Sequence, residues 1–304
     1  MTALDPADSS PMTALERRYR RLLLVYPREY RTAHGDELLD VLLESAGPGR
    51  TVPVLREAWG LLTGGVRSRV VHQATGSAWA DGLHLGVTAV AAANLATLLP
   101  FAHALPLWTL VSALGLLAIL RGWMRAGFAL TLAVGVKAVA ISGGWQPLDL
   151  TLLPVYPGPL GGPPLFGNSD PYVVAGSYAV VLIGLAVLAP RRRARVRSWW
   201  WWPAVVIAAW AGPEWMEDGT IFTISLSRMT VEALMFGLAV AAGYLARDHR
   251  WALAAGLYLA VVSGDLAIHS EELTRQHLAY AGLLLLLTLA AAFTPLRQRR
   301  HCLD

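Results

Sequence analysis

Eight long apolar segments constrain this chain more than any other feature of its sequence. They cover residues 82–100, 105–120, 126–144, 172–189, 199–211, 229–246, 251–270 and 277–293. A helix that crosses the hydrocarbon core of a bilayer needs roughly 20 apolar residues, with about 17 as a practical minimum. The second and fifth segments are short, and the fifth begins with tryptophans typical of a membrane interface. The pattern predicts an all-α, polytopic membrane helix bundle of about eight spans over residues 82–296.

The arginines are unevenly distributed between the loops that join these segments. With a cytoplasmic N-terminus, the inner loops and C-terminal end carry twelve arginines, and the outer loops carry only Arg228 and Arg275. The twelve are Arg121, Arg125, Arg191, Arg192, Arg193, Arg195, Arg197, Arg247, Arg250, Arg297, Arg299 and Arg300. An arginine excess on the cytoplasmic side sets membrane orientation. We therefore expect both termini in the cytoplasm, with residues 297–304 forming a basic tail.

The composition agrees with a chain that lies partly in water and partly in the lipid bilayer. Hydrophobic residues make up 55% of the 304 residues and charged residues 15%, and the charges gather towards the N-terminal end. The net charge of +4 is explained by membrane topology and anionic lipid headgroups, so we expect the lipid bilayer as a partner and no nucleic acid. Lysine occurs once and the other 24 Lys and Arg residues are arginine, a bias that, with abundant Ala, Gly and Leu, indicates a GC-rich bacterial genome. With the apolar segments, we therefore expect a bacterial plasma membrane as the location.

Residues 13–81 precede the first apolar segment and are predicted to form a small cytoplasmic helical domain, after a disordered stretch at residues 1–12. Proline and glycine punctuation predicts three amphipathic helices near residues 15–26, 35–46 and 53–72. Their apolar faces are narrow and interrupted by arginine, so we expect them to stay outside the bilayer. The predicted core between the first two helices consists of Tyr19, Leu22, Tyr26, Leu38 and Leu42.

The segment RYRRLLLVYPREYRTAHGDELLDVLLESA, residues 18–46, resembles a prefix that precedes membrane domains in many bacterial proteins. The shared pattern Y-R-x-L-L-x-x-Y-P-x-x-Y/F-R-x-x-x-G-x-E-L falls here on Tyr19, Arg20, Leu22, Leu23, Tyr26, Pro27, Tyr30, Arg31, Gly35, Glu37 and Leu38. Such prefixes occur in orphan permeases of the ABC-exporter type and in uncharacterised actinobacterial integral membrane proteins, some associated with PadR-type regulators. The resemblance covers about a tenth of the chain. It implies a helical prefix on a bacterial membrane protein, and it does not carry permease activity over to this chain.

Four polar residues lie within or at the end of predicted spans: Lys137 in the third, Glu232 in the sixth, and Asp265 and His269 in the seventh. A charged side chain at the middle of a span costs roughly 2.5–3.5 kcal/mol on insertion scales. The three charged residues fall in the outer half of the bilayer, so we expect Lys137 to contact Asp265 or, failing that, Glu232. Three readings stay open: a buried ion pair that fixes helix packing, a polar cavity for a small ligand, ion or proton, and side chains that reach the headgroups.

Catalytic and cofactor motifs are missing from the sequence. The only lysine lies in GVKAV, which excludes a P-loop, and no H-E-x-x-H zinc helix is present. The segment VSGD, residues 262–265, lacks the first glycine of the G-x-G-D motif of aspartyl intramembrane proteases. Cys302 is the only cysteine and cannot form an internal disulfide. We therefore expect no enzyme activity, no metal and no cofactor.

Two functional hypotheses follow from these patterns. The first is a non-enzymatic signalling or accessory protein that binds another membrane subunit or a cytoplasmic regulator through residues 13–72. The alternative is a small-solute or ion transporter that uses Lys137 and Asp265. A lipid-directed enzyme is a third possibility, supported only by the acidic outer loops, which contain Asp149, Asp170, Glu214, Glu217, Asp218, Glu271 and Glu272.

Overall fold

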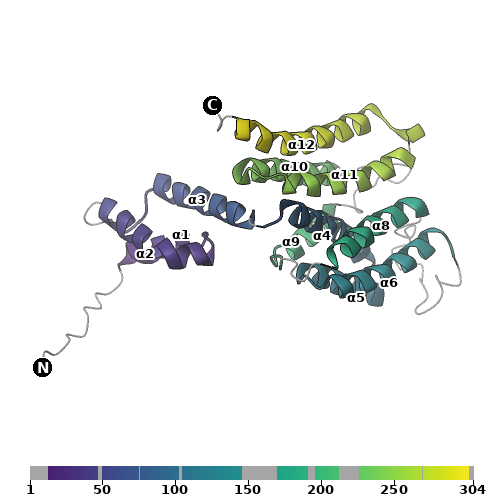
Figure 1. The fold of residues 1–304 in the computed structure, drawn as a ribbon, viewed down its shortest axis with the longest axis horizontal. Coiled ribbons are helices and arrows are strands. Elements are labelled where there is room, and N and C mark those ends of the chain that lie inside the picture. Colours follow the sequence, from purple (N-terminus) through teal and green to yellow (C-terminus); the bar gives the residue numbers. More distant parts are fainter. Residues whose placement is uncertain are drawn as a thin grey trace, which may run out of the picture. The chain divides into compact units, whose positions relative to one another are not determined.

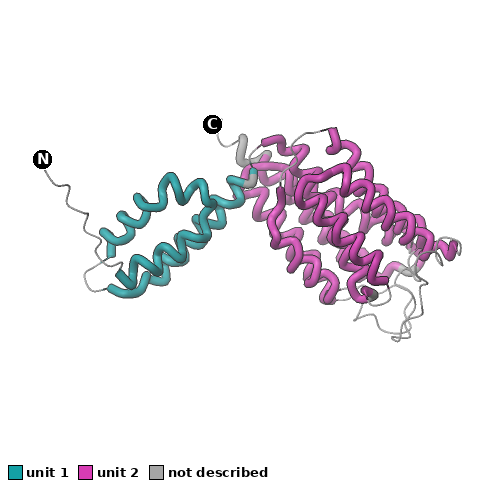
Figure 2. The backbone as a smooth tube through the Cα atoms, turned by 90° about the horizontal axis from the view of Figure 1, so that it is seen from below, with its two compact units in different colours: residues 1–75 teal, residues 76–304 magenta. Residues whose placement is uncertain are grey.

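The computed structural model describes residues 13–46, 50–74, 76–102, 105–145, 170–190, 196–211, 226–268 and 270–300, and every regular element within them is helical (Figure 1). The chain divides into two compact units, an N-terminal unit of residues 1–75 and a membrane unit of residues 76–304 (Figure 2). This division falls slightly before the boundary expected after residue 81, because the first helix of the membrane unit already begins at Ala78.

The N-terminal unit contains α1 (Ala14–Leu23), α2 (Arg28–Ser45) and α3 (Leu55–Gln73). The Thr13 hydroxyl caps α1 by accepting a hydrogen bond from the Glu16 backbone N–H at 3.1 Å. Proline cannot continue a helix, so Pro27 separates α1 from α2, which starts at Arg28 rather than near residue 35. Gly35, where the second helix was expected to begin, lies inside α2.

α1 packs against both α2 and α3 and supplies most of the core of this unit. The predicted core residues are confirmed: Tyr19 and Tyr26 are buried, and Leu22, Leu38 and Leu42 pack against them. The core also includes residues that the sequence pattern did not single out, namely Leu15, Leu23, Leu39 and Leu61. Leu61 matters most among these, because it attaches α3 to the other two helices.

The membrane unit contains eight α-helices in the described residues, at positions that match the eight apolar segments. They are α4 (Ala78–Leu98), α5 (Pro106–Leu120), α6 (Met124–Ser142), α8 (Pro171–Leu188), α9 (Trp201–Ala211), α10 (Leu226–Ala246), α11 (Arg250–Ile268) and α12 (Arg275–Arg300). Short 3₁₀ turns follow α4 and α11, at Leu99–Phe101 and Ser270–Glu272. α12 continues past Pro295 to Arg300, so part of the predicted tail is helical.

Five of these helices are long and apolar enough to cross a membrane, judged by length and composition: α6, α8, α10, α11 and α12 as far as Pro295. α5 and α9 are apolar but short. At 1.5 Å per residue their lengths are only about 22 and 16 Å, less than the roughly 30 Å hydrocarbon core. The chain is therefore a helical protein with several potential membrane spans, and the predicted count of eight is not confirmed by helix length alone.

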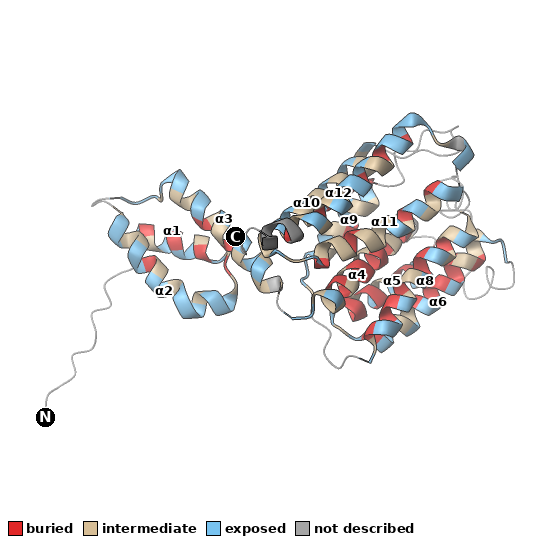
Figure 3. Cartoon of the chain, turned by 45° about the horizontal axis from the view of Figure 1, so that its top comes forward, coloured by how far each residue is buried: buried red, intermediate tan, exposed pale blue. Residues whose placement is uncertain are grey.

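α4 is the central helix of the membrane unit and packs on α11, α8, α9 and α5. The α4–α11 crossing is close: a Cβ added at Gly82 would lie only 2.8 Å from the Arg250 carbonyl oxygen. Small residues permit such close helix approach in membrane bundles. The main core gathers around α4, and Figure 3 shows buried residues concentrated on α4, α5 and α8.

α10 and α12 present a contrasting, outward-facing apolar surface. Leu234 and Leu238 on α10 and Leu286 on α12 are more than half exposed. Outside a membrane so much exposed leucine would be costly, whereas hydrocarbon is a good solvent for it. This distribution agrees with helices that contact lipid.

Candidate functional site

Glu232 lies at the centre of a polar cluster formed by α10, α11 and α12. Its side chain is buried, and one carboxylate oxygen accepts hydrogen bonds from the Arg228 guanidinium at 3.0 Å and the Tyr258 hydroxyl at 2.9 Å. The other oxygen accepts a hydrogen bond from the Tyr280 hydroxyl. Arg228 precedes Glu232 by one helical turn, so helix geometry alone holds these two side chains together.

Asp265, on α11, belongs to the same region because it interacts electrostatically with the Arg228 guanidinium. Two of the predicted intramembrane carboxylates therefore lie within electrostatic range of Arg228: Glu232, which is paired with it at 3.0 Å, and Asp265. Burying a carboxylate is costly unless it is paired and hydrogen-bonded, and Glu232 meets both conditions. Sequence reasoning missed Arg228, Tyr258 and Tyr280 as members of this cluster. The available signal was the i, i+4 spacing of Arg228 and Glu232.

Lys137 lies in a different part of the bundle. It is buried on α6, and its ammonium group is 6.0 Å from the centre of the Trp108 ring on α5. That separation is the limit for a cation–π interaction. α6 packs on α5 and α8, whereas α11 packs on α4, α12, α10 and α8. The predicted contact between Lys137 and Asp265 stays a prediction, and His269 lies outside the described residues.

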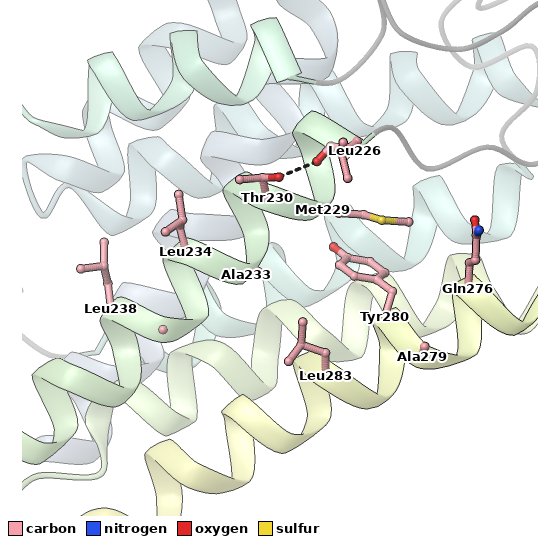
Figure 4. Close-up of a pocket in the computed structure, with 11 residues that line it drawn as sticks. Leu226, Met229, Thr230, Ala233, Leu234, Leu238, Gln276, Ala279, Tyr280 and Leu283 are labelled. Carbon is pink, nitrogen blue, oxygen red and sulfur yellow. Dashed lines mark hydrogen bonds between the residues drawn. The ribbon is translucent and has the colours of Figure 1, made fainter.

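A groove of about 870 Å³ runs between α10 and α12 beside the Glu232 cluster (Figure 4). Its walls are mostly apolar, including Leu234, Leu238 and Leu283. Tyr280 lines the groove and also donates to Glu232, so it connects the groove to the buried carboxylate. The Thr230 hydroxyl donates to the Leu226 carbonyl oxygen of its own helix, as Figure 4 shows. The groove can thus accommodate apolar groups next to a buried acidic centre.

A second polar cluster joins the beginnings of α4 and α11. The Arg250 side chain, only 1% exposed, donates to Asp81 at 2.7 Å and to Asp248 at 2.8 Å. Arg197 donates to both the carboxylate and the backbone carbonyl of Asp81, each at 2.7 Å. One largely buried carboxylate on α4, with its side chain 10% exposed, is therefore held by two arginines from distant parts of the sequence. Sequence reasoning placed Arg197 and Arg250 in inner loops but did not predict their partner.

The same cluster also satisfies the end of α5. The Arg197 backbone N–H donates to the Leu120 carbonyl oxygen at 2.7 Å, and a ring nitrogen of His84 lies 2.9 Å from the Ile119 carbonyl oxygen. The last carbonyls of a helix have no partner within the helix, so these contacts complete their hydrogen bonding. The first turn of α4, the end of α5 and the start of α11 thus meet at one end of the bundle.

Asp248 lies between α10 and α11, outside the apolar helices. Burial alone would raise the pKa of its carboxyl group, but hydrogen bonds from Arg250 outweigh burial and lower it. Asp248 also accepts from the Arg250 backbone N–H at 3.1 Å, an arrangement typical of a helix N-cap. Asp248 therefore remains ionised. It caps the start of α11 and pairs with the Arg250 side chain, which also contacts Asp81.

In the N-terminal unit, the Tyr19 hydroxyl on α1 donates to the Glu57 carboxylate on α3 at 2.6 Å. This hydrogen bond, with help from the Val54 backbone N–H and from Arg50, lowers the pKa of Glu57. Burial, reinforced by the same hydrogen bond, raises the pKa of Tyr19 to about 12. The pair joins α1 to α3, in addition to the contact that Leu61 makes with the core and the hydrogen bond from Arg69 to the Leu24 carbonyl oxygen at 2.7 Å.

The described residues contain no group of three or more His, Cys, Asp or Glu side chains placed to hold a metal ion. The two polar clusters offer ion pairing and hydrogen bonding, and the α10–α12 groove offers apolar contact. No protein family, curated protein or solved structure matches this chain.

Proposed function

We propose that this chain is an eight-span protein of the bacterial plasma membrane that acts without catalysis, as a signalling or accessory subunit. The N-terminal unit would bind another membrane subunit or a cytoplasmic regulator. The observation that carries this proposal is the separate compact unit that contains residues 14–73, which have their own core. The resemblance of residues 18–46 to prefixes on bacterial membrane proteins supports the same reading.

The membrane topology behind this proposal can be tested directly. A reporter fused after Asp304 and one placed before Thr13 should both report the cytoplasm, and one within residues 158–167 should report the outside. The arginine distribution is the basis for this expectation. A cytoplasmic signal from residues 158–167 would overturn the orientation and with it the placement of the N-terminal unit.

α2 offers the surface best suited to a protein partner. It carries five carboxylates against two arginines, and Asp36, Asp40 and Glu44 follow one another at helical spacing on its exposed side. A partner with a basic segment would be attracted to this row by charge complementarity. The proposal does not depend on this row alone, because the separately folded unit is its basis.

A photo-crosslinking residue in place of Val41, which is exposed on α2, tests the proposal in the bacterium that encodes the chain. We expect an adduct with one identified protein, which a reciprocal crosslinker in that protein reproduces and which Asp36→Arg with Glu44→Arg abolishes. A matched crosslinker at Leu286, exposed on α12, should not give the same adduct. Absence of a protein adduct, or an adduct insensitive to the charge reversals, would overturn the proposal.

A small-solute or ion transporter is the second candidate, and the Glu232 cluster favours it. Ionisable residues inside a membrane often mark ion or proton pathways. If this function is correct, the purified protein in liposomes should conduct protons or monovalent cations, and Glu232→Gln should abolish the flux. An equal leak from wild type and Glu232→Gln would exclude this role for the cluster.

A further inference from the structure

α3 carries an apolar stripe whose side chains are exposed (Leu55, Trp59 and Val66) or half-buried (Leu62 and Val70). Leu55, Trp59, Leu62, Val66 and Val70 recur at i, i+4, i+7, i+11 and i+15, which places them on one side of the helix. Leu55 is 84% exposed, Trp59 66% and Val66 50%. Leu61 and Glu57, which contact α1, lie on another side of the helix.

Exposed tryptophan and leucine on a unit outside the bilayer need an explanation, because a contiguous apolar surface in water usually marks an interaction site. Scattered apolar residues would not need one, but here five of them share one side of a single helix. Among the described helices of the unit, α3 packs extensively only on α1. The side of α3 that carries the apolar stripe is therefore available to an external surface.

Charge within the N-terminal unit is divided between its helices. α3 contains three arginines and one glutamate, α1 four arginines and one glutamate, and α2 two arginines and five carboxylates. On α3, Arg56 and Arg67 are exposed and flank the apolar stripe on one side. The single glutamate, Glu57, is engaged by Tyr19. An apolar stripe beside arginines, with tryptophan in it, is the pattern of a helix that lies in the interface of an anionic membrane.

The bilayer is also within covalent reach of α3. Four residues separate the end of α3 at Gln73 from the start of α4 at Ala78. At about 3.8 Å per Cα–Cα step, they can span at most about 19 Å. A helix tethered so closely to a membrane helix meets the headgroup region at high local concentration.

We propose that α3 lies on the cytoplasmic surface of the bilayer, with its apolar stripe inserted among the headgroups and with Arg56 and Arg67 on anionic phospholipids. This inference rests on the proposed function only in taking the N-terminal unit as cytoplasmic. It places α3 on the membrane and keeps the acidic α2 away from it, because anionic lipid repels carboxylates. The two helices then have different partners: α3 binds lipid, and α2 remains accessible to a protein.

Two matched single-cysteine variants test this arrangement in the full chain. Both carry Cys302→Ser to remove the only native cysteine, and one adds Val66→Cys on α3 while the other adds Val41→Cys on α2. Each is labelled with a polarity-sensitive fluorophore and reconstituted in nanodiscs of phosphatidylcholine alone or mixed with phosphatidylglycerol. Quenching by doxyl-labelled lipid is then compared with quenching by aqueous iodide.

In the anionic discs, the Val66→Cys probe should be quenched by doxyl lipid and protected from iodide, and the Val41→Cys probe should show the reverse. Arg56→Gln and Arg67→Gln should each lower the lipid-to-water ratio of the Val66→Cys probe by roughly fivefold at low salt. Arg28→Gln on α2 should leave that ratio unchanged and serves as the charge control.

Two results would overturn the proposal. Equal iodide quenching of both probes in both lipid compositions would mean that the stripe faces water. Protection of the Val66→Cys probe from both quenchers in both compositions would mean that protein covers α3, whether the membrane unit or a second copy. Neither result affects the crosslink from α2, so failure of this inference is distinguishable from failure of the proposed function.

Discussion

Arg250 and Asp81 form a buried ion pair at 2.7 Å although 169 residues separate them in the sequence. The pair joins the start of α11 to the start of α4, where Gly82 allows the two backbones to approach closely. Arg197 and Asp248 complete the cluster, so that two arginines face two carboxylates. A balanced set of charges of this kind avoids the penalty of an uncompensated buried ion.

Removing Arg250 should therefore destabilise the membrane unit strongly. Arg250→Met leaves Asp81 and Asp248 close together without their shared cation, and we expect a loss of about 3–5 kcal/mol. Arg250→Lys should recover only part of this loss, because lysine lacks the planar fork that reaches both carboxylates. Unfolding of the purified protein in mixed micelles measures both variants. A loss below about 1 kcal/mol for Arg250→Met would contradict the assignment, since exposed pairs contribute no more than that.

Glycine at position 82 should be essential to the α4–α11 crossing. A methyl group there would meet the backbone of Arg250, which cannot rotate away, so Gly82→Ala should cost about 1–3 kcal/mol through overpacking. Gly256→Ala, on α11, provides the matched control, because an added Cβ there has no atom within 4 Å. It should be neutral or stabilise by up to about 1 kcal/mol through helix propensity. Equal effects of the two substitutions in thermal unfolding would show that the crossing tolerates side chains.

The Glu232 cluster should fix α10, α11 and α12 relative to one another. Tyr258→Phe and Tyr280→Phe each remove one hydrogen bond to Glu232, and each should cost about 0.6–2 kcal/mol. Glu232→Leu should cost more, and Arg228→Met combined with it should restore part of the stability, since no unpaired charge remains. Thr230→Val is the control, because its hydroxyl bonds only within α10. The prediction fails if Thr230→Val costs as much as Tyr280→Phe.

Acid should weaken the N-terminal unit through Glu57. The pKa of Glu57 is lower in the folded state than in the unfolded chain, where it is about 4.5. Its contribution to the free energy of unfolding is therefore fully present above pH 4.5 and is lost as pH falls through the folded pKa. Tyr19, whose pKa is raised to about 12, contributes below its ordinary value of 10 and loses that contribution as pH rises through about 12.

Hydrogen exchange of residues 14–73 in the full chain can measure the acid effect, after correction for the intrinsic exchange rate at each pH. Protection should fall between pH 7 and pH 3 in the wild type. Glu57→Gln should start with lower protection and change less over this range. Glu44→Gln, at an exposed position on α2, should behave as the wild type does. If Glu57→Gln lost as much protection between pH 7 and pH 3 as the wild type does, another titrating group would be responsible for the acid response.

The pairing of Lys137 with Asp265 expected from the sequence can be decided by a double-mutant cycle. If the pair exists, Lys137→Met should destabilise the protein by about 3–5 kcal/mol, and adding Asp265→Leu should recover much of that loss. A cycle with Trp108→Leu tests the contact seen on α5, where a coupling of about 0.5–2 kcal/mol is expected for a cation–π interaction. Additive effects of Lys137→Met and Asp265→Leu would exclude the pair.

The locations of the helices could be predicted from the sequence because they depend on local patterns. The apolar segments that mark the membrane unit coincide with α4 to α12, and the core of Tyr19 and Tyr26 follows from helical spacing. Boundaries were less well predicted: α2 begins before the expected position, and α12 continues through Pro295. The number of spans could not be predicted from local patterns either. Short helices such as α5 and α9 cannot be assigned as spans by length, because their depth in the bilayer depends on the helices that pack against them.

The polar partners were decided by tertiary structure alone. Insertion cost identifies Glu232 and Asp265 as residues that need partners, but it does not say which ones, because partner choice depends on which helices pack together. The packing order brings Tyr258 and Tyr280 to Glu232, and it brings Arg197 and Arg250 to Asp81. Segment length and hydropathy were thus enough to predict a helical chain rich in potential membrane spans, because both are properties of single segments. Helix packing determined the two buried clusters, since each is assembled from residues that only the folded chain brings within hydrogen-bonding distance.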